Sequence, residues 1–179
     1  MVTDQTLFHN SLLTFYLISP PTFISLRYLQ APYGKHHRPG WGPTIPPSLA
    51  WFLMESPTVW LTLLLFPFGQ HRSHPKALTL ISPFLFHYIH RTFIYPLRLT
   101  RRKTTTGFPV GVALLAFAFN LLNSYLQARW VSHYADYDGD RWFWWRFAGG
   151  LAVFVSGMAV NVRSDLVLVG PEGGKWWWV

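Results

Sequence analysis

The chain has 179 residues, of which half are hydrophobic, 18% are aromatic and only 12% are charged. That charged share is about half of the roughly 25% found in soluble domains. The formal charge of +8 lies in short polar segments between apolar runs, which favours a protein facing anionic lipid over one binding nucleic acid. The chain contains no cysteine, so disulfides are excluded.

Five apolar runs are long enough, at about 20 residues each, to cross a bilayer as helices. The sequence therefore predicts an all-α, polytopic membrane bundle that forms a single domain over residues 1–179. Proline interrupts several runs, and we expect Pro20-Pro21 to break the first. The runs are Leu7–Leu29, Ser48–Phe68, Ala77–Leu97, Phe108–Gln127 and Trp142–Val160.

The connecting segments carry an uneven distribution of Lys and Arg. Eight lie in segments 30–47, 98–107 and the tail after 160, whereas four lie in segments 69–76 and 128–141. The positive-inside rule then predicts a cytoplasmic first loop, third loop and C-terminus, with a lumenal N-terminus. The first loop, YGKHHRPGWGPTIPP at 33–47, is rich in Gly and Pro, which predicts turns at the membrane surface.

Glu55, in WFLMESP, is the only carboxylate inside any of the five runs. A charged acid at the centre of a membrane helix costs about 2.5–3.5 kcal/mol on insertion scales, so such residues mark candidate functional sites. A protonated acid avoids part of this cost and can donate a hydrogen bond. The alternatives are a polar contact between packed helices or a position near the interface.

The stretch HYIHRTFIYPLRL, at 87–99, places several polar side chains inside another run. On a helix Tyr88, Arg91 and Tyr95 fall at i, i+3 and i+7, so they share one face. We expect this polar face to point into the bundle. The helix leads into a basic cluster suited to phosphate groups, although topogenic charge by itself also explains such a cluster. The cluster is Arg98, Arg101, Arg102 and Lys103.

Asn161 and Asp165 lie four residues apart where the fifth run meets the predicted cytoplasmic side. Their acceptors suit a ribose or an exocyclic amine, but they could also cap a helix or pair with an arginine. The histidine pairs lack a supporting carboxylate, so we expect no metal site. A small transporter remains an alternative because intramembrane ionisable groups also mark ion paths.

Four segments together resemble the steroid 5-alpha-reductase family of integral membrane reductases, in the family's order and spacing. They are YGKHHRPGWGPTIPPSLAWFLMESP (33–57), HYIHRTFIYPLRL (87–99), NSYLQARWVSHYADY (123–137) and FVSGMAVNVRSDLVL (154–168). The resemblance leans toward the steroid-type branch, with enoyl-CoA and polyprenol reductases as alternatives. It implies a seven-helix enzyme of the endoplasmic reticulum, of which about five helices are present here.

The resemblance implies NADPH-dependent reduction of the C4–C5 double bond of a 3-oxo-4-ene steroid or a similar enone lipid. It places Glu55 and Tyr88 at the pair of residues that polarise the substrate carbonyl. It also implies substrate contacts by Tyr33 and Trp51. The cofactor positions that it implies are Arg91, Tyr95, Arg102, Asn161 and Asp165.

The final residues, GGKWWWV, stand about where the family's Pro-Arg-Gly-Gly-Leu-Phe-type loop is expected. We expect the family's further helix pair, which supplies cofactor contacts, to be missing as well. We therefore expect a C-terminally truncated chain with weak or no NADPH-dependent activity. The alternative is a non-catalytic membrane protein that binds lipid or a full-length partner.

Overall fold

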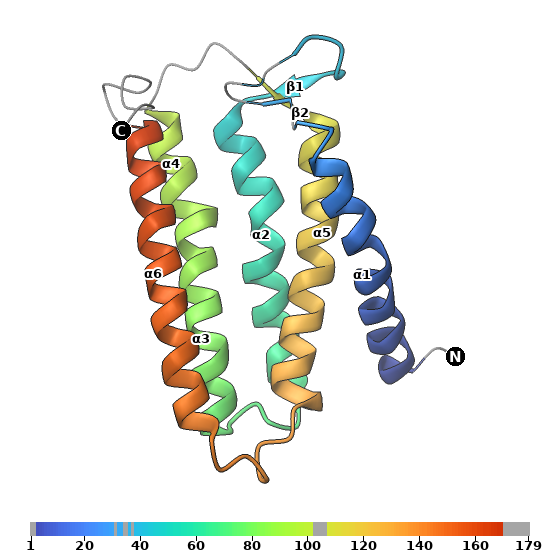
Figure 1. Cartoon of the computed structure of the whole chain (residues 1–179), viewed down its shortest axis with the longest axis vertical. Helices are drawn as coiled ribbons and strands as arrows, with labels where there is room; N and C mark the ends of the chain where they lie inside the picture. The colour runs from blue at the N-terminus through green and yellow to red at the C-terminus, as the bar shows by residue number, and fades with distance from the viewer. Residues whose placement is uncertain (1–2, 31, 34–35, 37, 102–106, 170–179) are drawn as a thin grey trace.

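The computed structural model describes residues 3–30, 32–33, 36, 38–101 and 107–169. In this part of the chain, α-helices form a bundle, with one small pair of strands at one end (Figure 1). This confirms the predicted all-α membrane bundle. The helices are α1 (Asp4–Leu26), α2 (Pro47–Leu65), α3 (Pro75–Ile89), α4 (Tyr95–Thr100), α5 (Val110–Arg129) and α6 (Phe143–Val169).

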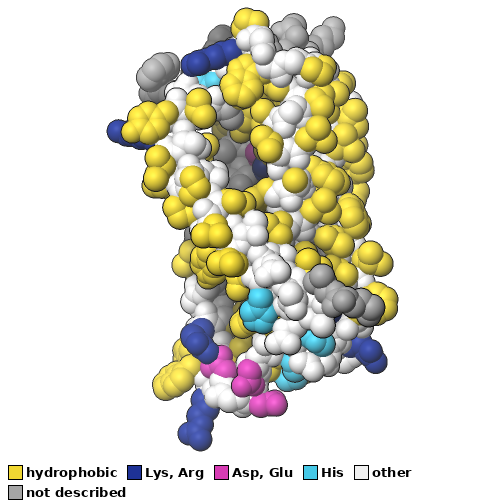
Figure 2. All heavy atoms as spheres, turned by 90° about the vertical axis from the view of Figure 1, so that its right-hand side faces the viewer, with side chains coloured by type: hydrophobic (Ala, Val, Ile, Leu, Met, Phe, Trp, Pro, Cys, Tyr) yellow, Lys and Arg dark blue, Asp and Glu magenta, His cyan; other side chains and the backbone are white. Residues whose placement is uncertain are grey.

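Each predicted apolar run coincides with a helical segment. Among the described residues, three helical stretches are long and apolar enough to cross a membrane: Pro47–Phe68, Val110–Tyr134 and Phe143–Val167. The number of five spans stays a prediction. Hydrophobic side chains cover much of the surface over the length of the bundle, whereas acidic side chains gather at one end (Figure 2). Such a surface suits hydrocarbon on its sides and water at its ends.

Helix α1 continues through Pro20 and Pro21, so the predicted break is wrong. Proline has a backbone angle that fits a helix, and its cost is a lost hydrogen bond and crowding of the preceding turn. On either side, the Ser19 hydroxyl donates to the Phe15 carbonyl and the Thr22 hydroxyl donates to the Ile18 carbonyl. These bonds go to the carbonyls on either side of those of residues 16 and 17, which are the two carbonyls that the prolines leave without an N–H partner.

Helices α3 and α4 form one rod, joined by a π-helical turn at His90–Ile94. The turn lies just before Pro96, which cannot donate to the carbonyl four residues earlier and would crowd it in a regular helix. The wider turn relieves this conflict, and the Tyr95 N–H donates to the His90 carbonyl five residues back. The sequence predicted a regular helix here. Such π turns often occur at functional sites.

The end of the bundle that holds the first loop is closed by a two-stranded pair. Strand β1 (Thr44–Ile45) pairs antiparallel with β2 (Phe108–Pro109). Gly40 and Gly42 adopt φ angles of 92° and 82° in the predicted turn-rich loop, a conformation that favours glycine. A Cβ on Gly107 would lie 2.3 Å from the Thr44 Oγ1, so only glycine permits this closure.

At the opposite end, the segments after α2 and α5 meet. The His71 N–H donates to the Ser132 carbonyl at 2.7 Å, and Lys76 Nζ donates to the Tyr137 carbonyl at 2.6 Å. Beneath them lies a core cluster of Ala77, Ile81, Val131, Ala135, Tyr137 and Phe143. Both ends of the bundle are therefore fixed by loop-to-loop contacts, and the polar site lies between them.

Candidate functional site

Helix α2 places Glu55 inside the bundle, with 8% of the residue exposed. Pro57 lacks the N–H that would bond the Leu53 carbonyl, and the Ser56 hydroxyl donates to that carbonyl at 3.0 Å. The Thr58 hydroxyl donates to the Glu55 carbonyl at 2.5 Å. The proline turn is therefore satisfied by neighbouring hydroxyls, which supports the backbone that carries the acid.

Arg91 connects Glu55 to α6. Its Nη2 donates to Glu55 Oε1 at 3.4 Å, while Nη1 donates to Asp165 Oδ2 at 3.2 Å and to Asn161 Oδ1 at 3.3 Å. The side chains of Arg91, Glu55 and Asp165 are 13%, 11% and 7% exposed. One guanidinium thus bonds residues of α2 and α6 in a water-poor interior, where unpaired charges are costly.

Aromatic rings hold the Arg91 guanidinium in place. Its Cζ lies 4.3 Å from the centroid of the Trp51 ring and 5.2 Å from that of Tyr95. The two rings meet edge to face at 5.1 Å. Cation–π contact of this kind stabilises a cation without neutralising its charge. The π turn therefore leaves Arg91 and Tyr95 in contact, as the predicted shared face requires.

Tyr88 lies on α3, half-buried, and is close enough to Glu55 and Arg91 to interact electrostatically with both. Its hydroxyl accepts a hydrogen bond from Asn123 Nδ2 at 3.4 Å. Its ring contacts Phe84 at 4.7 Å. The structure thus places the predicted acid and phenol on neighbouring helices of one polar interior.

Two asparagines of α5 belong to this site and were not identified from the sequence. Asn120, 7% exposed, donates through Nδ2 to the Met54 carbonyl at 2.6 Å and to Glu55 Oε2 at 3.3 Å. Asn123 bonds Tyr88 as described. The available signal was a pair of amides, three residues apart, inside an otherwise apolar run.

Two side-chain nitrogens close to Asp165 are buried and have no hydrogen-bond partner among the described residues: Arg98 Nη1, which is a donor, and His90 Nε2, which donates when it carries the ring proton. Both side chains interact electrostatically with Asp165. Buried donors normally have partners, so these two atoms suit an anionic group of a bound ligand. Asn161 and Asp165 add acceptors beside them, and this combination fits a nucleotide that carries phosphates and hydroxyls.

Two predicted site residues do not belong to this cluster as described. Tyr33 stacks on Phe108 at 4.9 Å, at the capped end of the bundle. Phe108 in turn packs in a cluster with Ala50 and Met54, so Tyr33 is one layer removed from the acid. Arg102 lies outside the described residues. Arg101 is exposed.

A second polar cluster ties α1 to the far end of α5. Asp4 Oδ2 accepts from Arg129 Nη2 at 2.6 Å, from Arg129 Nε at 3.1 Å and from the Tyr134 hydroxyl at 2.5 Å. The Tyr125 hydroxyl donates to Asp4 Oδ1 at 3.2 Å. Phe8 packs against the Tyr134 ring at 4.4 Å. This cluster was not identified from the sequence, because the partners of Asp4 lie 121 to 130 residues away in the chain.

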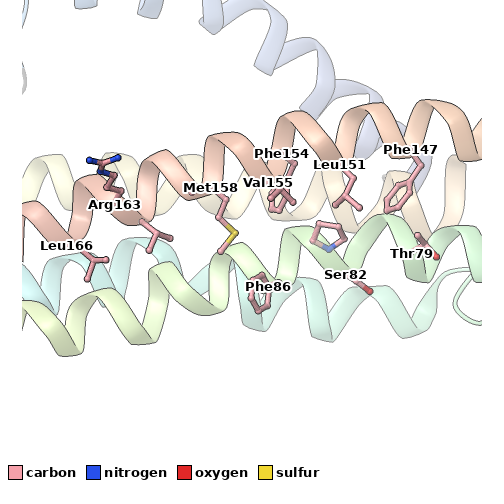
Figure 3. Close-up of a pocket in the computed structure, with 13 residues that line it drawn as sticks. Thr79, Ser82, Phe86, Phe147, Leu151, Phe154, Val155, Met158, Arg163 and Leu166 are labelled. Atoms are coloured by element: carbon pink, nitrogen blue, oxygen red, sulfur yellow. The ribbon is translucent and has the colours of Figure 1, made fainter.

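An apolar groove of about 1040 Å³ runs between α3 and α6 and contains none of the predicted site residues. Figure 3 shows Met158 of α6 pointing toward α3, with Phe86 on the opposite wall. Groups of three or more His, Cys, Asp or Glu side chains placed to hold a metal ion do not occur in the described part of the chain. The predicted site residues that the structure brings together lie around Arg91 instead.

Fold and site together define an integral membrane protein with a polar, ionisable site inside a helical bundle. The family model described as 3-oxo-5-alpha-steroid 4-dehydrogenase matches residues 106–174. The chain is 69% identical over 172 residues to Steroid 5-alpha-reductase DET2 of Gossypium hirsutum, covering 95% of this chain and 67% of that protein. Identity to the protein of the same name from Arabidopsis thaliana is 59% over 172 residues, covering 94% and 66%.

The chain therefore belongs to the steroid 5-alpha-reductase family. A more distant relative is 3-oxo-5-alpha-steroid 4-dehydrogenase 1 of Mus musculus, 33% identical over 148 residues, which cover 82% of this chain and 57% of the mouse protein. The matched regions span about two thirds of the two plant relatives. The predicted family is thus confirmed.

Proposed function

We propose that this chain contains the substrate-polarising residues of a membrane reductase, which reduces the C4–C5 double bond of a 3-oxo-4-ene steroid with NADPH. The observation that carries the proposal is the buried bridge from Glu55 through Arg91 to Asn161 and Asp165. It connects an acid and a phenol to a set of nucleotide-suited groups. Family membership and the names of the relatives support the same chemistry.

The chemistry on the steroid side follows from where charge develops. When a hydride adds to the β carbon of an enone, an electron pair moves to the ketone oxygen and forms an enolate. Donors aimed at that oxygen stabilise the transition state more than the ground state. The Tyr88 hydroxyl already accepts from Asn123, so its own proton is available for the ketone. The α carbon then receives a proton, which completes the saturated ketone.

Glu55 needs a change of partner to act as a donor. Both of its oxygens are placed to accept, Oε1 from Arg91 and Oε2 from Asn120. A carboxyl group can donate to a ketone only in its protonated form. We infer that this form is used when Arg91 turns toward the cofactor and Oε1 faces the steroid. The 3.4 Å length of the Arg91 contact is consistent with a bond that is easily exchanged.

On the cofactor side, NADPH supplies the hydride. Asn161 and Asp165 would bond its hydroxyl or amide groups, and His90 and Arg98 would contact its phosphates. Arg91 and Tyr95 complete this side, and Trp51 supports Arg91 through its ring. Substrate contacts by Trp51 and Tyr33, and a phosphate contact by Arg102, remain part of the proposal.

The test, like the turnover measurements described below, uses membranes that contain this chain, both alone and extended with the C-terminal segment of a family relative, because weak turnover is expected of the chain alone. The membranes are incubated with NADPH and progesterone as a 3-oxo-4-ene steroid. We expect the 5α-saturated ketone, at a rate lowered by Glu55→Gln, together with saturable binding of radiolabelled steroid. Ser156→Ala, on the exposed surface of α6 outside both the polar site and the groove between α3 and α6, is the control and should retain parental values. Absence of both conversion and specific steroid binding would end the proposal.

In the proposed topology, the first loop, the third loop and the C-terminus lie on the cytoplasmic side of the endoplasmic reticulum membrane. In Figure 1, the β1–β2 cap and the C-terminal end of α6 lie at the same end of the bundle. These are the segments predicted to face one side. A glycosylation acceptor inserted after Gly139 should be modified by lumenal enzymes, and one inserted after Gly42 should not. The reverse pattern would refute this orientation.

A second candidate function is non-catalytic binding of a lipid or a full-length partner. The apolar groove between α3 and α6 is the observation that favours it. Under this alternative, Met158→Trp should weaken co-purification of lipid or partner, and Glu55→Gln should have no effect. The reductase proposal predicts the opposite: Glu55→Gln should lower steroid turnover, and Met158→Trp should not.

A further inference from the structure

Asn120 and Asn123 are three residues apart on α5, so both face the same side of that helix. One contacts α2 and the other contacts α3, and each bonds one of the two side chains proposed to polarise the ketone. The proposed reaction as set out above needs neither amide to touch the steroid. The two hydrogen bonds can instead orient the side chains of Glu55 and Tyr88.

The Asn120 amide has a defined orientation. Its Nδ2 lies 2.6 Å from the Met54 carbonyl oxygen and 3.3 Å from Glu55 Oε2, and both partners are acceptors when Glu55 is ionised. Turning the amide over would set its oxygen against the Met54 carbonyl oxygen, which is unfavourable. The Met54 carbonyl thus fixes the amide, and the amide assigns Oε2 the role of acceptor. Oε1 is left as the oxygen that can carry a proton.

The Asn123 amide controls the direction of the Tyr88 proton. Because Asn123 Nδ2 donates to the Tyr88 oxygen at 3.4 Å, the phenol proton points elsewhere. If the amide oxygen faced Tyr88 instead, it would accept that proton and remove it from the substrate. Hydrogen bonds of this kind are often long before substrate binds and shorten in the working complex.

We propose that Asn120 and Asn123 are positioning residues. Through them, α5 holds the Glu55 carboxyl group and the Tyr88 hydroxyl at a set distance from each other, with the protons of both directed at one ketone oxygen. The proposal rests on the function proposed above. One helical turn separates the two amides, and each reaches a different neighbouring helix. A change in either amide should therefore alter polarisation of the bound ketone, with little change in how much steroid binds.

The test compares Asn123→Leu, which has nearly the same shape but no donor, with Leu114→Ala on the exposed side of α5. Asn123→Gln keeps an amide and serves as the conservative variant. For Asn123→Leu we expect kcat to fall by about 10-fold to 100-fold, with the steroid dissociation constant changed less than about threefold. Asn123→Gln should recover part of kcat, and Leu114→Ala should match the parent.

A second readout does not depend on turnover. Infrared difference spectroscopy of testosterone labelled with ¹³C at its C3 ketone reports polarisation of the bound carbonyl. The stretch should shift to lower frequency in the parent and return toward the solution value in Asn123→Leu, and similarly in Asn120→Leu. Thermal unfolding in detergent shows whether each variant is folded.

Three outcomes are decisive. A folded Asn123→Leu with parental kcat and parental carbonyl frequency would overturn the positioning role. Equal losses of unfolding temperature, binding and kcat would overturn it too, because they would indicate a structural role alone. If the parent binds no steroid and Glu55→Gln changes nothing, the proposed function fails first and the inference fails with it.

Discussion

Two arginine–carboxylate clusters connect helices in this bundle, and they differ in depth and in the way the cation is shared. Arg129 gives two short bonds, 2.6 and 3.1 Å, to a single oxygen of Asp4, whose side chain is 44% exposed. Arg91 distributes bonds of 3.2–3.4 Å over three acceptor side chains inside the bundle. The Asp4–Arg129 pair holds α1 against α5, and we call it the clamp. The Arg91 cluster is instead a site in which the arginine can exchange one hydrogen-bond partner for another.

The difference shows how burial changes the meaning of the same ion pair. A partly exposed pair gains little because water screens it and competes for its atoms. A buried pair has large opposing desolvation and Coulomb energies, so removing one partner leaves a costly unpaired charge. The Arg91 cluster therefore needs a reason beyond stability, and the proposed binding of substrate and cofactor supplies one.

The largest expected effect comes from comparing two single variants, each of which removes one of the two arginines. Arg91→Met leaves Glu55 and Asp165 buried without their main partner and should cost about 3–5 kcal/mol of unfolding free energy. Arg129→Met should cost about 1 kcal/mol or less, since Asp4 can be hydrated. Chemical unfolding in detergent, followed by tryptophan fluorescence, measures both. Equal losses for the two variants would remove the distinction between site and clamp.

The next effect separates chemistry from folding. Glu55→Gln keeps the size of the side chain and removes the acid, so we expect turnover of a 3-oxo-4-ene steroid to fall by about 100-fold to 1000-fold. Asp4→Asn is the matched change in the other cluster and should leave kcat within about twofold. Steady-state kinetics in nanodiscs measures both. If Asp4→Asn lowers kcat as much as Glu55→Gln does, the clamp is part of the catalytic machinery.

The smallest effect is a pH dependence of the clamp. Partial burial acts to raise the pKa of Asp4, but the hydrogen bonds from Tyr134 and Arg129 outweigh it and hold the pKa below its ordinary value. A carboxylate with a lowered pKa contributes stability above its unfolded pKa of about 3.9 and loses it as pH falls through the folded pKa. Helix α1 should therefore loosen from α5 below about pH 4.

Spin labels on α1 and α5 at exposed positions, Tyr16 and Leu115, report this loosening as a longer distance at low pH. Asp4→Asn should remove the transition, although other carboxylates still titrate in both proteins. A transition of unchanged size in Asp4→Asn would show that a different group controls the position of α1.

The sequence was sufficient for the helical class and for the charged part of the site. A lone carboxylate and an arginine inside apolar runs are rare, so Glu55 and Arg91 stand out against hydrocarbon. Asn120 and Asn123 were missed because neutral amides in a helix are common and their roles depend on contacts about 35 and 65 residues away in the chain. Asp4 was missed for the same reason, since Arg129 is 125 residues distant.

The backbone irregularities of the helices were not predicted correctly from the positions of proline. Pro20-Pro21 was expected to break α1 and does not, whereas Pro96 was expected in a regular helix and follows a π turn. A single sequence shows where proline removes a hydrogen bond, but not whether neighbouring hydroxyls or a wider turn will absorb the loss. The β1–β2 pair depends on residues about 60 positions apart, and local pattern does not reveal such pairing.

The most direct test of the central claim, that Glu55 and Tyr88 together polarise one ketone oxygen during hydride addition, is an isotope-tracing experiment. Membranes holding this chain are given a 3-oxo-4-ene steroid and NADPH deuterated at the transferable position, in ordinary water. The account predicts one deuterium at C5 of the saturated ketone and a solvent hydrogen at C4, with yield strongly reduced in Glu55→Gln and in Tyr88→Phe. Deuterium at C3, as in reduction of the carbonyl itself, or equal yields from parent and both variants, would contradict it.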